Sequence, residues 1–194
     1  MVTTVDARAA EVLAYWFGEG VEYGRSRKLW FEKNAAVDDG IRTRFMPLYE
    51  QGADAGLGAW KIMPGDCLAL IVLLDQFPRN MFRGSARAFA ADALALDAAR
   101  HAVAADYDSA MLPAERLFVY LPFEHSEVRE DQVTACRLIE PLDAFTETHG
   151  MYRYAVRHRE IIERFGRFPH RNAAIGRAST AEEVAFLQQP GSGF

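Results

Sequence analysis

The sequence has few cysteines and no long apolar run. Only Cys67 and Cys136 occur in 194 residues, and neither belongs to a CxxC pair. This usage predicts reduced, buried thiols in a cytoplasmic protein, because disulfide frameworks belong mainly to small secreted chains. The longest apolar run, Cys67 to Leu74, has eight residues, whereas a membrane-spanning helix needs roughly 20. The first ten residues also lack the apolar segment of a signal peptide, so we expect no membrane partner.

Excess positive charge and the common nucleotide and hydrolase motifs are missing as well. The net charge of −5 argues against a nucleic-acid partner, whose footprint is basic. The sequence contains no GxSxG, Walker or GxGxxG motif, so the corresponding hydrolase, P-loop and dinucleotide classes have no support. His125, His158 and His170 do not form an HExxH-type pair, so we expect no metal and no cofactor.

What is present predicts a single all-α domain over residues 1–194. Alanine, leucine and arginine are plentiful and period-2 alternation is scarce. Short Gly and Pro turns between the helices favour antiparallel helix pairs, stacked as an α-α superhelix or an irregular bundle. The expected helices cover residues 7–17, 37–51, 67–76, 91–105, 113–120, 126–148, 152–165 and 180–187.

Residues 67–76 are apolar on all sides and are expected to form the central buried helix. A buried parallel strand is the competing interpretation, but no strand-like runs accompany it. We expect Asp66 to cap this helix and Pro78 to end it.

Three further boundaries depend on single residues. Pro122 should end the helix that begins at Pro113, Ser126 should cap the next helix, and Pro141 should kink or break it. Thr180 and Glu183 have the spacing of a capping box that opens the last helix.

The most unusual segment runs from Arg164 to Asn172. It holds three arginines, a histidine and an asparagine among two phenylalanines, a glycine and a proline. Residues 74–80 and 121–127 also combine Phe and Pro with charge, so we expect all three segments to converge on one site. The predicted ligand-binding residues are Arg79, Arg167, His170, Arg171 and Asn172, because guanidinium groups suit carboxylates and phosphates.

His125, His158 and Glu127 are the candidate catalytic residues, acting in proton transfer. The structural alternative stays open for each. His158 lies on the apolar face of its helix and suits a hydrogen-bonded core histidine. His125 and Glu127 suit the start of a helix, where the positive end of the helix dipole would stabilise the Glu127 carboxylate. The arginines suit ion pairs with Asp75, Glu127 or Glu160, which would staple loops together.

Together, the segments Leu73–Asn80, Tyr120–Glu127 and His158–Asn172 resemble the bacterial domain-of-unknown-function family 924. The resemblance extends from Trp16 and Phe17 to the capping box at Thr180. It implies an all-α, tetratricopeptide-like superhelical fold and no established activity. The chain departs from the family pattern at Glu124, where Met is usual, so the resemblance gives Glu124 no role.

Three functions are compatible with these observations. The first is a binding module for an anionic small molecule or a peptide carboxylate. The second is a hydrolase or transferase that uses a histidine as acid or base and arginines to hold an anion. The third is a scaffold whose polar cluster is only structural. A carboxylate–histidine pair open to a pocket would favour the enzyme, and arginines fully paired without a cavity would favour the scaffold. The sequence predicts no particular oligomeric state.

Overall fold

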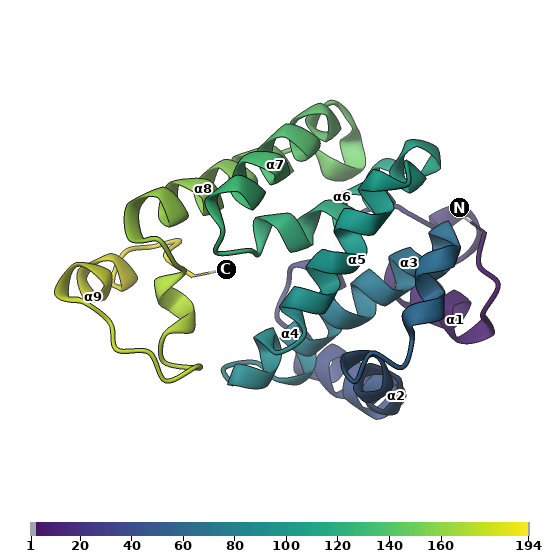
Figure 1. Cartoon of the computed structure of the whole chain (residues 1–194), viewed down its shortest axis with the longest axis horizontal. Coiled ribbons are helices and arrows are strands. Elements are labelled where there is room, and N and C mark those ends of the chain that lie inside the picture. Colours follow the sequence, from purple (N-terminus) through teal and green to yellow (C-terminus); the bar gives the residue numbers. More distant parts are fainter. Residues whose placement is uncertain (1–2, 194) are drawn as a thin grey trace.

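The computed structural model describes residues 3–193, which form helices joined by short turns (Figure 1). No strand occurs in this range, so the all-α prediction is confirmed. The tetratricopeptide-like superhelix stays a prediction. Within the described part of the chain, no helix is both long and apolar enough to cross a membrane. The helices are α1 (Ala7–Phe17), α2 (Ala35–Ala53), α3 (Pro64–Ile71), α4 (Phe77–Met81), α5 (Asp92–Ala104), α6 (Pro113–Glu124), α7 (Arg129–Ile139), α8 (Met151–Phe165) and α9 (Ala181–Leu187).

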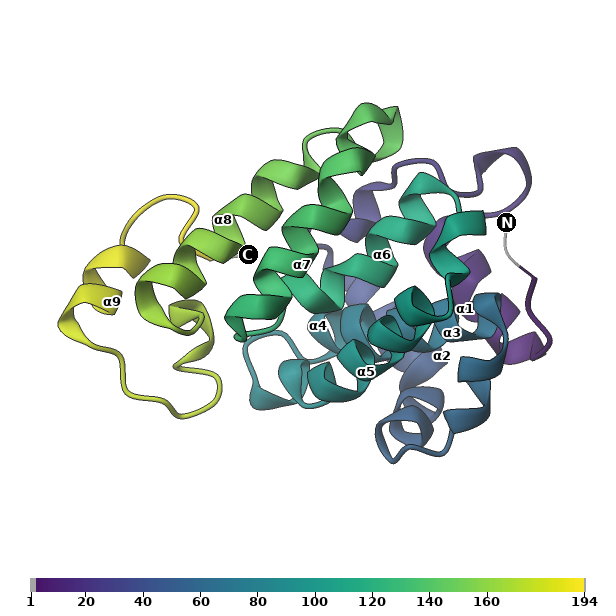
Figure 2. The ribbon, with the colours of Figure 1, turned by 45° about the horizontal axis from the view of Figure 1, so that its top comes forward.

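Helix α3 lies at the centre of the main hydrophobic core. It packs against α1, α5 and α6, and Figure 2 shows these helices around it. Every residue from Gly65 to Ile71 is buried, which confirms the prediction of a buried central helix. Cys67 and Cys136 are both free and buried. Burial raises the pKa of the Cys67 thiol to about 12, so this thiol stays protonated and unreactive at neutral pH.

The prediction that Pro78 ends this helix is wrong. The chain continues from α3 through a π-helical turn, η4 (Val72–Gln76), into α4. The backbone N–H of Phe77 donates to the carbonyl of Val72, five residues back. Pro78 has no N–H, but it occupies the first turn of α4, where that donor is not needed. The wider turn therefore lets the chain continue as one helical rod, and Asp75 lies in the π-helical turn between α3 and α4.

Two predicted caps are also wrong. Helix α3 begins at Pro64, and the buried Asp66 instead accepts backbone hydrogen bonds from Val5 and Asp6. Helix α7 begins after Val128, and the hydroxyl of Ser126 accepts from the Val128 N–H and donates to Asp131. A tertiary contact therefore takes the Asp66 carboxylate, whereas the Ser126 hydroxyl makes only local contacts, to residues two and five positions further on.

The two prolines that were expected to interrupt helices behave differently. Pro122 lies inside α6, which continues to Glu124, so the prediction that it ends the helix is wrong. A proline in the last turn removes only one helical hydrogen bond, and the surrounding α6 residues are buried in the core. Pro141 does break its helix, because α7 ends at Ile139 and a 3₁₀ turn, η7 (Glu140–Ala144), follows.

A second, smaller apolar cluster joins α8, α9 and the segment between them. It consists of Ile161, Ile162, Phe168 and Phe186. Helix α8 ends at Gly166, whose φ of 69° lies in the left-handed region, as the sequence predicts. The 166–180 segment then leads to α9, which opens with the expected capping box of Thr180 and Glu183. This cluster places the arginine-rich segment opposite α4 (Figure 1).

Replacing Thr180 by alanine is expected to lower the free energy of unfolding by about 1 kcal/mol. The Thr180 hydroxyl accepts from the Glu183 N–H, and the Glu183 carboxylate accepts from the Thr180 N–H. Urea denaturation followed by circular dichroism measures the change. The control Thr180→Ser keeps the hydroxyl and should retain nearly all the stability. Equal midpoints for wild type and Thr180→Ala would show that the cap contributes nothing.

Candidate functional site

A cavity of about 580 Å³ lies between the main core and the C-terminal cluster. This volume falls within the range of small-molecule sites. Its walls come from segments far apart in sequence: residues 30–33, α4 and the turn after it, α6, α8 and residues 170–171. The polar and charged lining residues are Glu32, Lys33, Gln76, Arg79, Asn80, Arg83, Glu124, His125, Tyr154, His158, His170 and Arg171.

The central feature of the site is a carboxylate–histidine pair. Nδ1 of His125 lies 2.8 and 2.9 Å from the two carboxylate oxygens of Asp75. A carboxylate only accepts hydrogen bonds, so Nδ1 carries the proton and donates it. In neutral His125, Nε2 is then the proton acceptor, and no described residue hydrogen-bonds to it. His125 lines the cavity, so an oriented base faces a space that a small molecule can enter.

The charge states of this pair suit that arrangement. Asp75 is fully buried, which raises its pKa, but Arg79, His125 and Gln76 outweigh the burial and lower the pKa to about 2. Burial and the neighbouring Arg79 lower the pKa of His125, against the opposing effect of Asp75. At neutral pH Asp75 is therefore ionised and His125 is neutral, as a general base requires.

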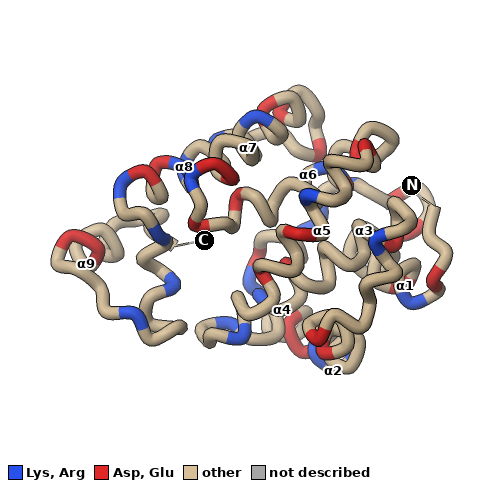
Figure 3. Tube along the Cα trace, in the orientation of Figure 1, with Lys and Arg blue, Asp and Glu red and all other residues tan. Residues whose placement is uncertain are grey.

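Two arginines from opposite sides of the cavity share one carboxylate, that of Asp92 at the start of α5. Arg79 donates to both Asp92 oxygens, at 3.0 and 3.1 Å, and lies 3.3 Å from Asp75. Arg171 donates to Asp92 at 3.1 Å and to the carbonyl of His125 at 2.9 Å. Figure 3 shows basic positions along α4 and, across from them, on the segment that follows α8.

The positive charge of Arg171 is incompletely compensated. Its Nε is buried and has no hydrogen-bond partner among the described residues. Burial, together with the nearby charge of Arg79, lowers the pKa of Arg171 to about 10.

A second carboxyl group beside the cavity has the opposite character. Burial and the negative charge of Asp75 raise the pKa of Glu124 to about 8, so Glu124 is protonated at neutral pH. Its Oε1 lies 3.1 Å from Nδ1 of His158, which also donates to the Tyr154 carbonyl at 2.8 Å. Burial and the neighbouring His125 lower the pKa of His158 to about 3. Both partners are therefore neutral, because a low-dielectric site disfavours their charged forms.

The structure brings together most, but not all, of the residues singled out in the sequence. Arg79, His125, His158, His170 and Arg171 line the cavity. His158 is also buried in contact with Phe168, at a ring distance of 5.5 Å, as the core interpretation expects. Burial and Arg171 lower the pKa of His170 to about 4, so it is neutral at pH 7.

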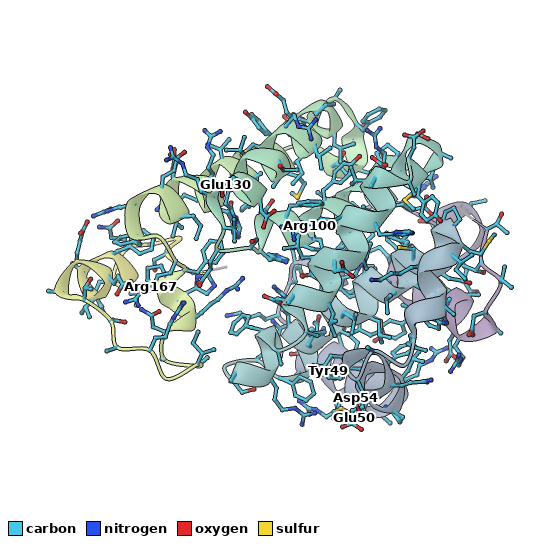
Figure 4. All side chains as sticks on the ribbon, viewed as in Figure 1. Tyr49, Glu50, Asp54, Arg100, Glu130 and Arg167 are labelled. Carbon is cyan, nitrogen blue, oxygen red and sulfur yellow. The ribbon has the colours of Figure 1, made fainter. Side chains whose placement is uncertain are left out.

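The other three predicted site residues lie outside the cavity wall. Arg167 pairs with Glu183 at 2.6 and 2.8 Å and lies toward α9 (Figure 4). Asn172 is buried and donates to Ser179, while Glu127 pairs with Arg177 at 2.7 and 2.8 Å. These contacts connect the 166–180 segment to α9 and to the turn between α6 and α7, which is the stapling role that the sequence left open.

Sequence reasoning missed Asp92 and assigned no role to Glu124. Asp92 is an ordinary first-turn acid of an amphipathic helix, and nothing local distinguishes it from Asp97 in the same helix. Trp30, Phe31, Met151 and Tyr154 were also not predicted to line the site. A signal for Glu124 did exist, because a carboxyl group that follows the apolar run from Leu117 to Phe123 demands a partner.

The fold and the cavity define an all-helical protein with a buried polar site. The chain matches, over residues 12–191, the family described as bacterial protein of unknown function (DUF924), and it belongs to that family. It is similar to a solved structure of a protein of unknown function, ATU0120 from Agrobacterium tumefaciens. The two are 40% identical with a TM-score of 0.82, over 94% of this chain and 97% of that one. No curated protein matches the chain.

Replacing Arg79 by methionine is expected to lower the free energy of unfolding by about 3 kcal/mol or more, because it leaves the buried, ionised Asp75 with only two neutral partners, His125 and Gln76. It should also raise the pKa of His125, since Arg79 helps to lower it. Urea denaturation measures the first effect and ¹H–¹⁵N NMR titration of His125 the second. The control Arg25→Met removes an exposed pair with Glu22 and should change stability little. An unchanged His125 titration would contradict the assigned electrostatics.

Replacing Glu124 by glutamine is expected to flatten the pH dependence of stability between pH 7 and 8. The folded pKa of Glu124 is raised to about 8, so the folded protein holds a proton that the unfolded chain releases. Wild-type stability should therefore fall as pH rises through this window, by up to about 1.4 kcal/mol per pH unit. Urea denaturation at pH 7 and 8 measures the slope. Parallel curves for wild type and Glu124→Gln would show that Glu124 is ionised in the folded protein, whereas the exposed control Glu130→Gln should match wild type.

Proposed function

We propose that the protein is an enzyme, a hydrolase or transferase that acts on an anionic small molecule in the cavity. The observation that carries the proposal is the Asp75–His125 pair, 2.8 Å apart and open to a space of about 580 Å³. A carboxylate that orients a histidine, whose free nitrogen then faces the substrate, is the arrangement that general-base catalysis requires.

In this proposal His125 accepts a proton at Nε2 from water or from a substrate hydroxyl, and the resulting nucleophile attacks the substrate. Asp75 holds the correct tautomer and stabilises the imidazolium that forms. Glu124, protonated at neutral pH, gives its proton to the leaving group. A net proton transfer from His125 to Glu124 then restores both groups. Two carboxyl groups whose environments separate their pKa values commonly divide the roles in this way.

Arg171 and Arg79 are the residues proposed to hold the anionic part of the substrate. Both line the cavity, whereas their partner Asp92 does not. The same holds for Arg83, which lines the cavity while its partner Asp38 lies outside the wall. These arginines face the cavity and their carboxylate partners do not, so the cavity surface is more positive than the sum of the paired charges suggests.

The two alternatives are less well supported. A pure binding module has no need of a histidine whose tautomer is fixed by a buried carboxylate. A scaffold explains the paired arginines, because Arg79, Arg167 and Arg177 each contact a carboxylate at hydrogen-bond distance. It does not explain an open cavity at the polar cluster, since a structural cluster of this kind is normally packed shut.

The test begins with a thermal-shift screen of carboxylates, phosphate esters and nucleotides, because a ligand at 100 times its Kd stabilises by about 2.7 kcal/mol. Esters and phosphate monoesters related to the hits, together with 4-nitrophenyl acetate and 4-nitrophenyl phosphate, are then assayed for turnover. His125→Asn is expected to lower kcat/KM by about 10²- to 10⁴-fold while the protein stays folded. His149 is 76% exposed at its side chain, and His149→Asn serves as the matched control.

The pH profile supplies an independent readout. Turnover should fall at acid pH as His125 is protonated, below the ordinary histidine pKa, and at alkaline pH as Glu124 ionises near 8. Glu124→Gln should lower the rate and remove the alkaline limb. Wild-type turnover by His125→Asn, or the absence of turnover for every compound that binds in the cavity, would overturn the proposed function.

A further inference from the structure

The cavity changes from apolar to polar along its length. On α6 the lining residues are Leu117, Leu121 and Glu124, which share one helix face at spacings of four and three, and His125 follows directly at the end of the helix. The first two are apolar and the last two carry the proposed chemistry. Seven residues of α-helix rise about 10 Å, so the face of α6 turns from apolar to polar over about that distance.

Helix α8 repeats the same change. Its lining residues are Met151, Tyr154 and His158, again on one face, with the apolar residue first and the histidine about 10 Å further on. Figure 2 shows α6 and α8 running in the same direction, with α7 returning beside them. Their polar ends meet, because Glu124 lies 3.1 Å from His158. Their apolar ends therefore also face the same end of the cavity.

An aromatic pair extends the apolar end. Trp30 and Phe31 line the cavity, and their rings lie 5.1 and 6.5 Å from that of Phe118, next to Leu117 on α6. Phe31 is 56% exposed, which is unusual for a phenylalanine in contact with a core ring. Glu32 and Lys33, which follow Phe31, are exposed at this opening.

The remaining wall, on α4 and the segment that follows it, is mostly polar, with Ala88 and Phe89 as its apolar members, and its charges are already partnered. Arg83 and Asn80 both donate to Asp38, and Arg79 donates to Asp92. This wall accommodates polar substituents on one side of a ligand. The orientation of the ligand is then set by α6 and α8.

From these walls we infer that the substrate is an amphipathic anion. It has one carboxylate or phosphate group at the His125–Arg171 end and an apolar body about 10 Å long, which lies against Leu121, Met151 and Phe31. The inference rests on the proposed function for the reacting end, and it adds the class of substrate. A small hydrophilic anion would leave the apolar half of the cavity in contact with water, so the complex would lack the free energy gained when apolar surface is buried.

The experiment is isothermal titration calorimetry with straight-chain carboxylates from acetate to octanoate, the alkyl phosphates of the same lengths, and the matching uncharged amides. Affinity is expected to rise up to about fourfold per added methylene, and the anions should bind at least about tenfold more tightly than the amides. The carboxylate and phosphate series distinguish the two head groups.

Variants separate the two ends of the ligand. Phe31→Ala and Met151→Gln alter residues outside the fully buried core and should reduce the gain per methylene while preserving the preference for anions. Arg171→Met should do the reverse. The control Phe145→Ala removes another exposed phenylalanine, 43% exposed, that does not line the cavity, and should leave every affinity unchanged. Binding that is independent of chain length, a gain per methylene that survives both apolar variants, or no binding by any probe up to 10 mM would overturn the inference.

This test is separable from that of the proposed function. His125→Asn should keep the chain-length dependence of binding while it loses turnover. If amphipathic anions bind as expected but no variant at His125 affects any turnover, the proposed function fails and the ligand class stands. If turnover depends on His125 but prefers short hydrophilic anions, the function stands and the amphipathic substrate is wrong.

Discussion

The site depends on one constraint, the burial of the Asp75 carboxylate in a helical rod, directly after the apolar run from Cys67 to Leu74. A buried carboxylate must be neutralised by protonation or by ion pairs and hydrogen bonds. Here the second solution applies, with Arg79 and His125 as the partners. Arg79 in turn engages Asp92, which engages Arg171, which donates to the backbone carbonyl of His125. Because His125 also pairs with Asp75, these contacts form a closed ring that begins and ends at His125. This closed ring ties the arginine-rich segment, α4, α5 and α6 together around the cavity.

The π-helical turn makes this ring possible. It occurs where the rod carries both an acidic residue and a proline, and π-turns of this kind occur frequently at functional sites. In a regular α-helix the N–H of residue 78 would donate to the carbonyl of Leu74, and proline cannot supply that bond. The wider turn places Pro78 in the first turn of α4, where its missing N–H is not needed. The Arg79 side chain donates to the Asp75 carbonyl. The same short stretch therefore tolerates Pro78 and presents Asp75 to His125.

The sequence predicts the helical class and most helix positions, because apolar periodicity, caps and glycine stops are local signals. Helix α1, the Gly166 stop and the Thr180 capping box agree with expectation residue by residue. At Asp66 a long-range hydrogen bond and at Pro122 the packing of the core override the local preference. At Pro78 and Ser126 the reason is local, because a π-helical turn accommodates the proline and the serine bonds to Val128 and Asp131. Arg79, His125 and His170 line one cavity, and the signal for their proximity in the sequence is the combination of Phe, Pro and charge that their segments share. The sequence could not identify Asp92 as a site residue, because its role depends on Arg79 and Arg171, which are 13 and 79 residues away in the sequence.

The ring also limits how the site can bind an anion. Arg79 and Arg171 direct much of their hydrogen-bonding capacity to Asp92, so neither presents a complete guanidinium fork to a ligand. Bidentate recognition, the strongest form of anion binding by arginine, is therefore reduced, and a small anion alone would be held weakly. The donors that remain are fixed in place before a ligand arrives, which lowers the entropy cost of binding. For the amphipathic anion proposed above, affinity then comes largely from the apolar faces of α6 and α8. A site built in this way favours ligands in which the charged group determines orientation and the apolar body determines how tightly they bind.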